Sequence, residues 1–118
     1  MSKILVVDDD LDHVNLLRIR LEENQYEVIT ALNGEEGLEK AEREKPDLIV
    51  LDIMMPTIDG YTMSRAMSAI EWLREIPLIV ITGKKGMEEL FQVQSVKAFF
   101  VKPYRADDLV KKVKEILN

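Results

Sequence analysis

The stretch Leu48–Leu51 reads LIVL and is followed directly by Asp52. Four apolar residues in a row, without polar alternation, are typical of a strand that is buried on both faces of a sheet. Four other short runs share this character, and longer segments separate them. The pattern predicts five strands, over Ile4–Val7, Val28–Ala31, Leu48–Leu51, Leu78–Ile81 and Phe99–Val101.

Apolar residues recur at helical spacing between these runs and after the last one. The second helix shows a start signal, because Asn33 can act as an N-cap and Glu36 follows three positions later. The last helix carries the clearest apolar stripe. The five helices are indicated by Val14, Leu17 and Leu21; by Gly37, Leu38 and Ala41; by Met63, Met67, Ile70 and Leu73; by Met87, Leu90 and Phe91; and by Leu109, Val110, Val113, Ile116 and Leu117.

Five repeats of strand followed by helix predict a parallel sheet. Parallel strands need long crossover connections, which are right-handed and place helices on both faces. We therefore expect an α/β fold with a doubly wound, five-stranded parallel sheet and five helices, forming one domain over residues 1–118.

Composition excludes several classes of function. The 118 residues carry 16 Lys and Arg against 22 Asp and Glu, a formal charge of -6, which is unsuited to direct nucleic-acid binding. There is no Cys, so disulfides, thiolate metal sites and Cys nucleophiles are excluded, and a reducing compartment is favoured. No apolar run approaches the length of a membrane span or forms a signal peptide. We expect a cytoplasmic protein that does not contact the membrane.

Polar residues follow four of the five predicted strands. Ligands of doubly wound sheets bind outside the carboxyl ends of the strands, so these residues are expected to share one site. Asp8, Asp9 and Asp10 follow the first strand, Asp52 the third, Thr82 and Gly83 the fourth, and Lys102 the fifth.

Carboxylates gathered at one edge require a compensating positive charge. At ~4 Å and an effective dielectric constant of about 20, two of them repel each other by about 4 kcal/mol. A cluster that offers oxygen ligands suits a hard divalent cation, and Mg²⁺ is the ordinary choice. With Lys102 as a second positive charge, the site could accept a phosphoryl group, for which the Asp52 carboxylate is the expected nucleophile.

Each of these residues has an ordinary structural role when it is considered alone. An Asp can cap a helix or close a strand, Thr82–Gly83 suits a turn, and Lys102 could be a surface side chain. Their joint placement at the ends of four strands favours the functional interpretation.

Four motifs resemble the receiver domains of bacterial two-component response regulators, including single-domain chemotaxis regulators. They are LVVDDD at 5–10, DLIVLDIMMPTIDG at 47–60, PLIVITG at 77–83 and VKPY at 101–104. The spacing is also similar, with 30 residues from Asp52 to Thr82 and 20 more to Lys102. The resemblance spans essentially the whole chain and implies a flavodoxin-like fold with strand order 2-1-3-4-5.

The resemblance implies a role for each site residue. Asp52 would accept a phosphoryl group from a phosphohistidine of a histidine kinase or phosphotransfer protein, and the domain would catalyse its own phosphorylation and dephosphorylation. Asp9, Asp52 and the carbonyl of Met54 would bind Mg²⁺ directly, and Asp8 would bind it through water. Thr82, Gly83 and Lys102 would contact the phosphoryl group, whereas Met54 and Lys84 would flank the site.

Output in this family depends on an aromatic residue three positions before the Lys, which is Phe99 here. When Thr82 moves toward the phosphoryl group, this ring turns inward and remodels the face formed by the fourth helix, fifth strand and fifth helix. Because Phe99 lacks the hydroxyl of the commoner Tyr, we expect it to populate the inward state even without phosphorylation. Plain core packing is the alternative.

Other interpretations remain open from the sequence. Asp8, Asp9 and Asp10 match the Asp-x-Asp nucleophile motif of haloacid dehalogenase phosphatases, in which Asp8 would be the nucleophile. A receiver fold could also serve as an adaptor that is never phosphorylated. His13 lies four residues after Asp9, where a surface position near the site is favoured over a transition-metal ligand. The kinase, the pathway, the output protein or effector domain, and any phosphorylation-dependent dimer are not specified by the sequence.

Overall fold

A computed structural model describes residues 1–53, 69–83 and 96–118 of the chain. Five strands form one parallel sheet in the order β2-β1-β3-β4-β5, as expected. The strands are β1 (Lys3–Val7), β2 (Glu27–Ala31), β3 (Leu48–Ile53), β4 (Leu78–Thr82) and β5 (Val96–Val101). The helices that the structure describes are α1 (Leu11–Glu23), α2 (Gly34–Glu44), α4 (Glu71–Arg74) and α5 (Ala106–Leu117).

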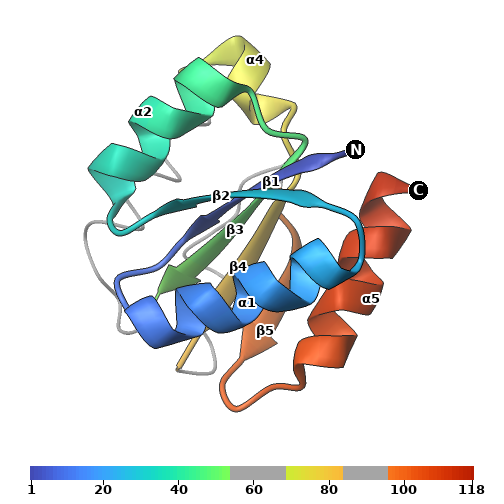
Figure 1. The fold of residues 1–118 in the computed structure, drawn as a ribbon. Helices are drawn as coiled ribbons and strands as arrows, with labels where there is room; N and C mark the ends of the chain where they lie inside the picture. Colours follow the sequence, from blue (N-terminus) through green and yellow to red (C-terminus); the bar gives the residue numbers. More distant parts are fainter. Residues whose placement is uncertain (54–68, 84–95) are drawn as a thin grey trace.

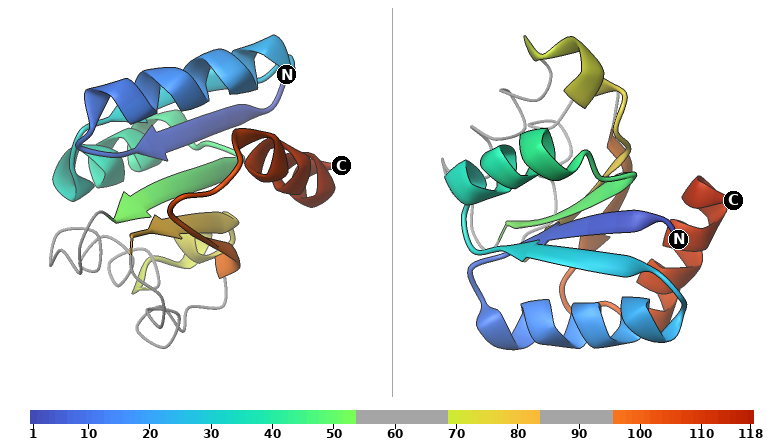
Figure 2. Two further views of the ribbon diagram at one scale, coloured as in Figure 1. Left: turned by 90° about the horizontal axis from the view of Figure 1, so that it is seen from below. Right: turned by 45° about the horizontal axis from the view of Figure 1, so that its top comes forward.

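Helices cover both faces of the sheet. Figure 1 shows α1 and α5 on one face and α2 with α4 on the other, and the turned views of Figure 2 show the same layering. This arrangement confirms the doubly wound α/β fold. The expected third helix is described only from residue 69 on, and α4 lies in this part of it. The expected fourth helix, around Met87 to Phe91, lies outside the described residues.

The sheet separates two hydrophobic clusters. One cluster includes Leu5 and Leu51 of the sheet with Ala41 of α2. The other packs sheet residues against α1 and α5 and includes Leu17 and Val113. Because side chains alternate along each strand, the unbroken apolar runs supply both clusters at once.

Local sequence signals define the helix ends. The Asn33 side chain accepts a hydrogen bond of 2.8 Å from the backbone N–H of Glu36, so the predicted N-cap of α2 is confirmed. The Glu36 carboxylate in turn accepts the backbone N–H of Leu32. Asp10 caps α1 in the same way, because its side chain accepts the N–H groups of Asp12 and His13.

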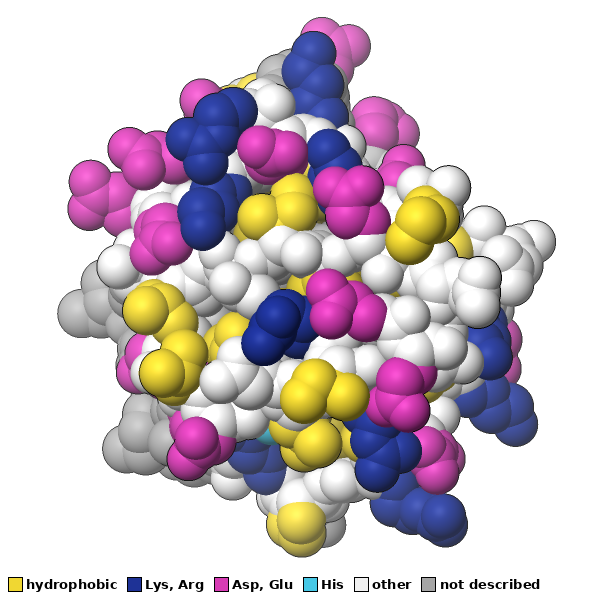
Figure 3. Space-filling view, in the orientation of Figure 1, with side chains coloured by type: hydrophobic (Ala, Val, Ile, Leu, Met, Phe, Trp, Pro, Cys, Tyr) yellow, Lys and Arg dark blue, Asp and Glu magenta, His cyan; other side chains and the backbone are white. Residues whose placement is uncertain are grey.

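Charged side chains of both signs are interspersed on the face shown in Figure 3, without a large field of a single sign. Among the described residues, no helix combines the length and apolar character needed to cross a membrane.

Candidate phosphoacceptor and metal site

The strand register places the two central carboxylates at one level of the sheet. Val7 of β1 pairs with Leu51 of β3, so Asp8, just after β1, and Asp52, near the end of β3, lie at the same level of the sheet. Thr82 lies at the end of β4, opposite Ile53 and Val101. The strand order reverses between β1 and β3, and this is the position where doubly wound folds bind ligands.

Asp52 lies at the centre of the site with its side chain completely shielded from solvent. The Nζ atom of Lys102 lies 2.8 Å from its Oδ2 atom. The Oδ1 atom is buried and makes no hydrogen bond to the part of the chain that the structure describes. A buried carboxylate oxygen without a partner is costly, so this atom is poised to bind a cation.

Lys102 is held at the site by the backbone of the neighbouring strand. Its N–H donates to the carbonyl oxygen of Thr82 at 2.8 Å, and its peptide bond to Pro103 is cis. Thr82 is itself 1% exposed. The structure therefore brings Asp8, Asp52, Thr82 and Lys102 to the edge that the sequence predicted.

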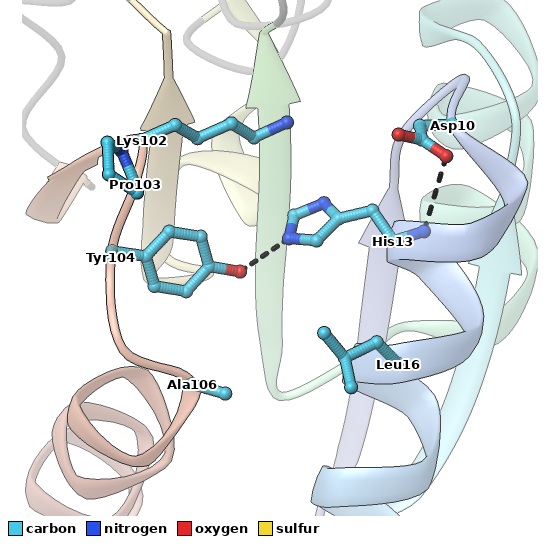
Figure 4. A pocket seen from close by; sticks show the side chains of 7 residues that line it. All are labelled: Asp10, His13, Leu16, Lys102, Pro103, Tyr104 and Ala106. Atoms are coloured by element: carbon cyan, nitrogen blue, oxygen red, sulfur yellow. Dashed lines mark hydrogen bonds between the residues drawn. The ribbon is translucent and has the colours of Figure 1, made fainter.

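His13 is part of the site, although the sequence predicts only a surface position near it. Its Nδ1 atom lies 2.5 Å from Oδ2 of Asp8 and 2.7 Å from Oδ2 of Asp52, and its side chain is only 12% exposed. Its Nε2 atom lies 2.5 Å from the Tyr104 hydroxyl, as Figure 4 shows. The spacing of His13 from Asp9 was the one available signal, but it suggested proximity rather than this contact.

The charges of the site act on one another. Burial raises the pKa of Asp8, and this effect outweighs the hydrogen bond to His13. Burial also opposes ionisation of Asp52, but His13 and Lys102 together hold the pKa of its carboxyl below the ordinary value. Hydrogen bonds to Asp52 and Asp8 raise the pKa of His13 to about 9. Opposite shifts of two adjoining carboxyl groups are typical of a functional site.

Asp9 and Asp10 differ from Asp8 in their surroundings. Both side chains are exposed, and the group of donor atoms suited to a metal consists of Asp8, His13 and Asp52 in the described part of the chain. The Asp10 side chain caps α1, and this structural role explains Asp10 without the phosphatase interpretation.

Four other predicted site residues are placed farther from Asp52 or lie outside the described residues. Phe99 is half-buried and packs against the cluster beneath α2. Gly83 is exposed just beyond β4. Met54 and Lys84 lie outside the described residues.

A metal ion fits this donor set. Carboxylate oxygens of Asp8 and Asp52 and a ring nitrogen of His13 lie within 4.8 Å of one another, and Oδ1 of Asp52 has no hydrogen-bond partner among the described residues. The two carboxylates supply oxygen ligands that suit a divalent cation.

The family model of the response regulator receiver domain matches residues 4–114. The chain is a member of the response regulator receiver family. It is 41% identical over 121 residues to the alkaline phosphatase synthesis transcriptional regulatory protein PhoP of Bacillus subtilis, a match that covers 99% of this chain and 49% of PhoP. The receiver domain thus spans about half the length of this curated relative.

Solved structures of the family have the same fold. The chemotaxis response regulator CheY4 of Vibrio cholerae is 27% identical with a TM-score of 0.87, and the match covers 98% of each chain. The response regulator TrrA of Thermotoga maritima, solved with Mg²⁺ and BeF, is 34% identical with a TM-score of 0.84, over 98% of this receiver domain and 99% of TrrA. These similarities identify a component of two-component signalling.

Proposed function

We propose that Asp52 is the phosphoacceptor of this receiver domain and that residues 1–118 form one signalling unit. The observation that carries the proposal is the buried Asp52 carboxylate, which has Lys102 on Oδ2 and an Oδ1 atom without a hydrogen-bond partner among the described residues. An oxygen of this carboxylate would form the new P–O bond as the P–N bond of a donor phosphohistidine breaks. The electron pair of that bond would stay on the donor nitrogen, and with a proton on the other ring nitrogen the histidine kinase or phosphotransfer protein would keep a neutral imidazole.

The residues around Asp52 would stabilise the transferred group. Lys102 is positioned to balance its negative charge, and the Thr82 hydroxyl, with the backbone at Gly83, would donate hydrogen bonds to its oxygens. Preorganised donors of this kind are the protein's main contribution to phosphoryl transfer, so the domain would catalyse its own phosphorylation and dephosphorylation.

Mg²⁺ would supply the positive charge that the phosphoryl group needs on its other side. Asp52 and Asp9 would bind the ion directly, Asp8 would bind it through water, and the carbonyl of Met54 would complete the set. TrrA, which was solved with Mg²⁺ and BeF, supports Mg²⁺ as the ion by similarity. Met54 and Lys84 would also control how readily water reaches the site.

The output would pass through the face around β5. Thr82 and Phe99 lie on neighbouring strands, and Phe99 would follow the movement of Thr82 toward the phosphoryl group. A further protein or effector domain would read this face in the cytoplasm. The receiver domain alone would bind neither nucleic acid nor membrane, and a phosphorylation-dependent dimer is one form that the output could take.

Intact-mass spectrometry after incubation with acetyl phosphate and Mg²⁺ tests the proposal. Wild-type protein and Asp8→Asn are compared with Asp52→Asn. We expect a phosphoryl adduct on the wild type and none on Asp52→Asn. An adduct that is lost only in Asp8→Asn would support the phosphatase alternative instead, and no adduct on any protein would support the adaptor alternative.

A further inference from the structure

His13 presents a nitrogen ligand to the carboxylates of the proposed metal site. Its Nδ1 atom lies within 2.7 Å of an oxygen of both Asp8 and Asp52. His13 belongs to α1, whereas the carboxylates end β1 and lie in β3, so the three donors converge from separate elements. The imidazole of His13 thereby adds a nitrogen ligand to the oxygen ligands of the two carboxylates.

We propose that His13 is a direct ligand of the bound cation and gives this site a preference for transition-metal ions, such as Mn²⁺ and Ni²⁺, over Mg²⁺. This inference rests on the proposed metal site, in which Asp52 binds the ion directly and Asp8 binds it through water. Carboxylate and water ligands suit Mg²⁺, whereas imidazole binds first-row transition ions more strongly, in an order that rises from Mn²⁺ to Ni²⁺.

The imidazole is oriented for this role by Tyr104. Nε2 of His13 contacts the Tyr104 hydroxyl at 2.5 Å, and the two rings meet edge to face with centroids 5.8 Å apart. When Nε2 carries the proton, its N–H donates a hydrogen bond to the hydroxyl oxygen, and the lone pair of Nδ1 faces the carboxylates. Metal-binding His residues commonly have such an outer hydrogen bond, which sets the tautomer and the ring orientation.

A second observation points to a cation at this place. The Asp52 side chain is fully shielded from solvent, and its Oδ1 atom makes no hydrogen bond to the described residues. A cation beside this oxygen would remove the cost of burying it without a partner. One cation at this place could therefore bind both the Asp52 carboxylate and the Nδ1 atom of His13.

The ring has room to adjust to an ion. Ligands at right angles around an ion with bonds of about 2.1 Å lie about 3 Å apart, slightly farther than His13 lies from the two carboxylates. A cavity of about 460 Å³ adjoins the imidazole, lined by Leu16, Lys102 and Tyr104 among others (Figure 4). A small withdrawal of the ring toward this cavity would open the coordination distance.

Calorimetric titration of metal-free protein with MgCl₂, MnCl₂ and NiCl₂ tests the inference. We expect the wild type to bind Ni²⁺ and Mn²⁺ more tightly than Mg²⁺. His13→Ile should lower the Ni²⁺ and Mn²⁺ affinities by at least about tenfold, the loss typical of removing even an outer partner of a ligand. The Mg²⁺ affinity should change much less. Glu23→Gln, at the far end of the same helix, is the control and should leave all three affinities unchanged.

Pulsed electron paramagnetic resonance of the Mn²⁺-loaded wild type provides a second readout that does not depend on a variant. The chain contains one His, so a ¹⁴N coupling of imidazole type would identify His13 as the ligand. Absence of this coupling overturns the inference. A rise in affinity for every cation in His13→Ile also overturns it, because the imidazole would then be a competitor of the ion.

Failure of the inference differs from failure of the proposed function. If Asp52→Asn abolishes Mg²⁺ binding while His13→Ile leaves Ni²⁺ binding unchanged, only the role of His13 is overturned. If Asp52→Asn binds Mg²⁺ as tightly as the wild type, the metal site itself is overturned, and the inference falls with it.

Discussion

The Nδ1 atom of His13 lies 2.7 Å from the Oδ2 atom of Asp52, and the Nζ atom of Lys102 lies 2.8 Å from the same oxygen. Without a metal, a protonated imidazole and an ammonium group can balance the charges of Asp8 and Asp52. His13 thus has a different role in each state. It carries a positive charge in the metal-free protein and would be a neutral ligand in the proposed metal-bound protein.

The protonation of His13 in metal-free protein is directly measurable. We expect an NMR titration of its ring protons to give a pKa of about 9, because hydrogen bonds to Asp52 and Asp8 favour the charged form and raise the pKa above the ordinary value of 6.5. The resonance belongs to the only His of the chain.

The same shift makes stability depend on pH. Because the folded pKa is raised, the stabilising contribution of His13 is fully present below pH 6.5 and is lost as the pH rises through about 9.

Asp52→Asn should lower the pKa of His13. A value near 6.5 in the wild type would contradict the contact with the carboxylates.

Tyr104→Phe should destabilise the metal-free protein by about 1 kcal/mol, the usual net value of one hydrogen bond. The ring should keep its packing against Phe100, whose centroid lies 5.7 Å away, so the change isolates the hydroxyl that contacts His13. Urea denaturation measures the loss. In a His13→Ala background the substitution should have little effect, and an equal loss in both backgrounds would show that the hydroxyl acts elsewhere.

Two adjacent Leu residues of α1 provide a test of the packing. Leu17 is 0% exposed beneath the helix, whereas Leu16 is 46% exposed. Leu17→Ala should lower the free energy of unfolding by roughly 2–5 kcal/mol because it leaves a cavity in the core. Leu16→Ala should change it by less than about 0.5 kcal/mol. Similar losses from both variants would contradict the orientation of the helix.

Phe99 stays a prediction as a switch residue. We expect the unphosphorylated protein to populate the inward ring position, since a Phe side chain gains nothing from solvent. Phe99→Tyr should shift the ring outward, because the added hydroxyl favours a hydrated position. Ring-proton NOE contacts to Val80, its partner on β4, report the inward state. Equal NOE intensities in the two proteins would refute the expectation.

The fold could be predicted from the sequence because each signal is local. An uninterrupted apolar run such as Leu48–Leu51 can be satisfied only between two covered faces, and the Asn33 cap marks a helix start without reference to the rest of the chain. In a parallel sheet all carboxyl ends meet at one edge. The residues after the strands, Asp8, Asp52, Thr82 and Lys102, were therefore predictable as neighbours.

Only the tertiary structure decided what surrounds these residues. The place of His13 depends on where Asp10 starts α1 and on how that helix rotates as Leu17 packs against the sheet. The partner of its ring, Tyr104, is 91 positions away in the chain. Strand-end residues are brought together by backbone hydrogen bonds that the sequence pattern reveals, whereas the contacts of a helix side chain are set by packing between elements. For that reason the carboxylates could be predicted from sequence, and the imidazole between them could not.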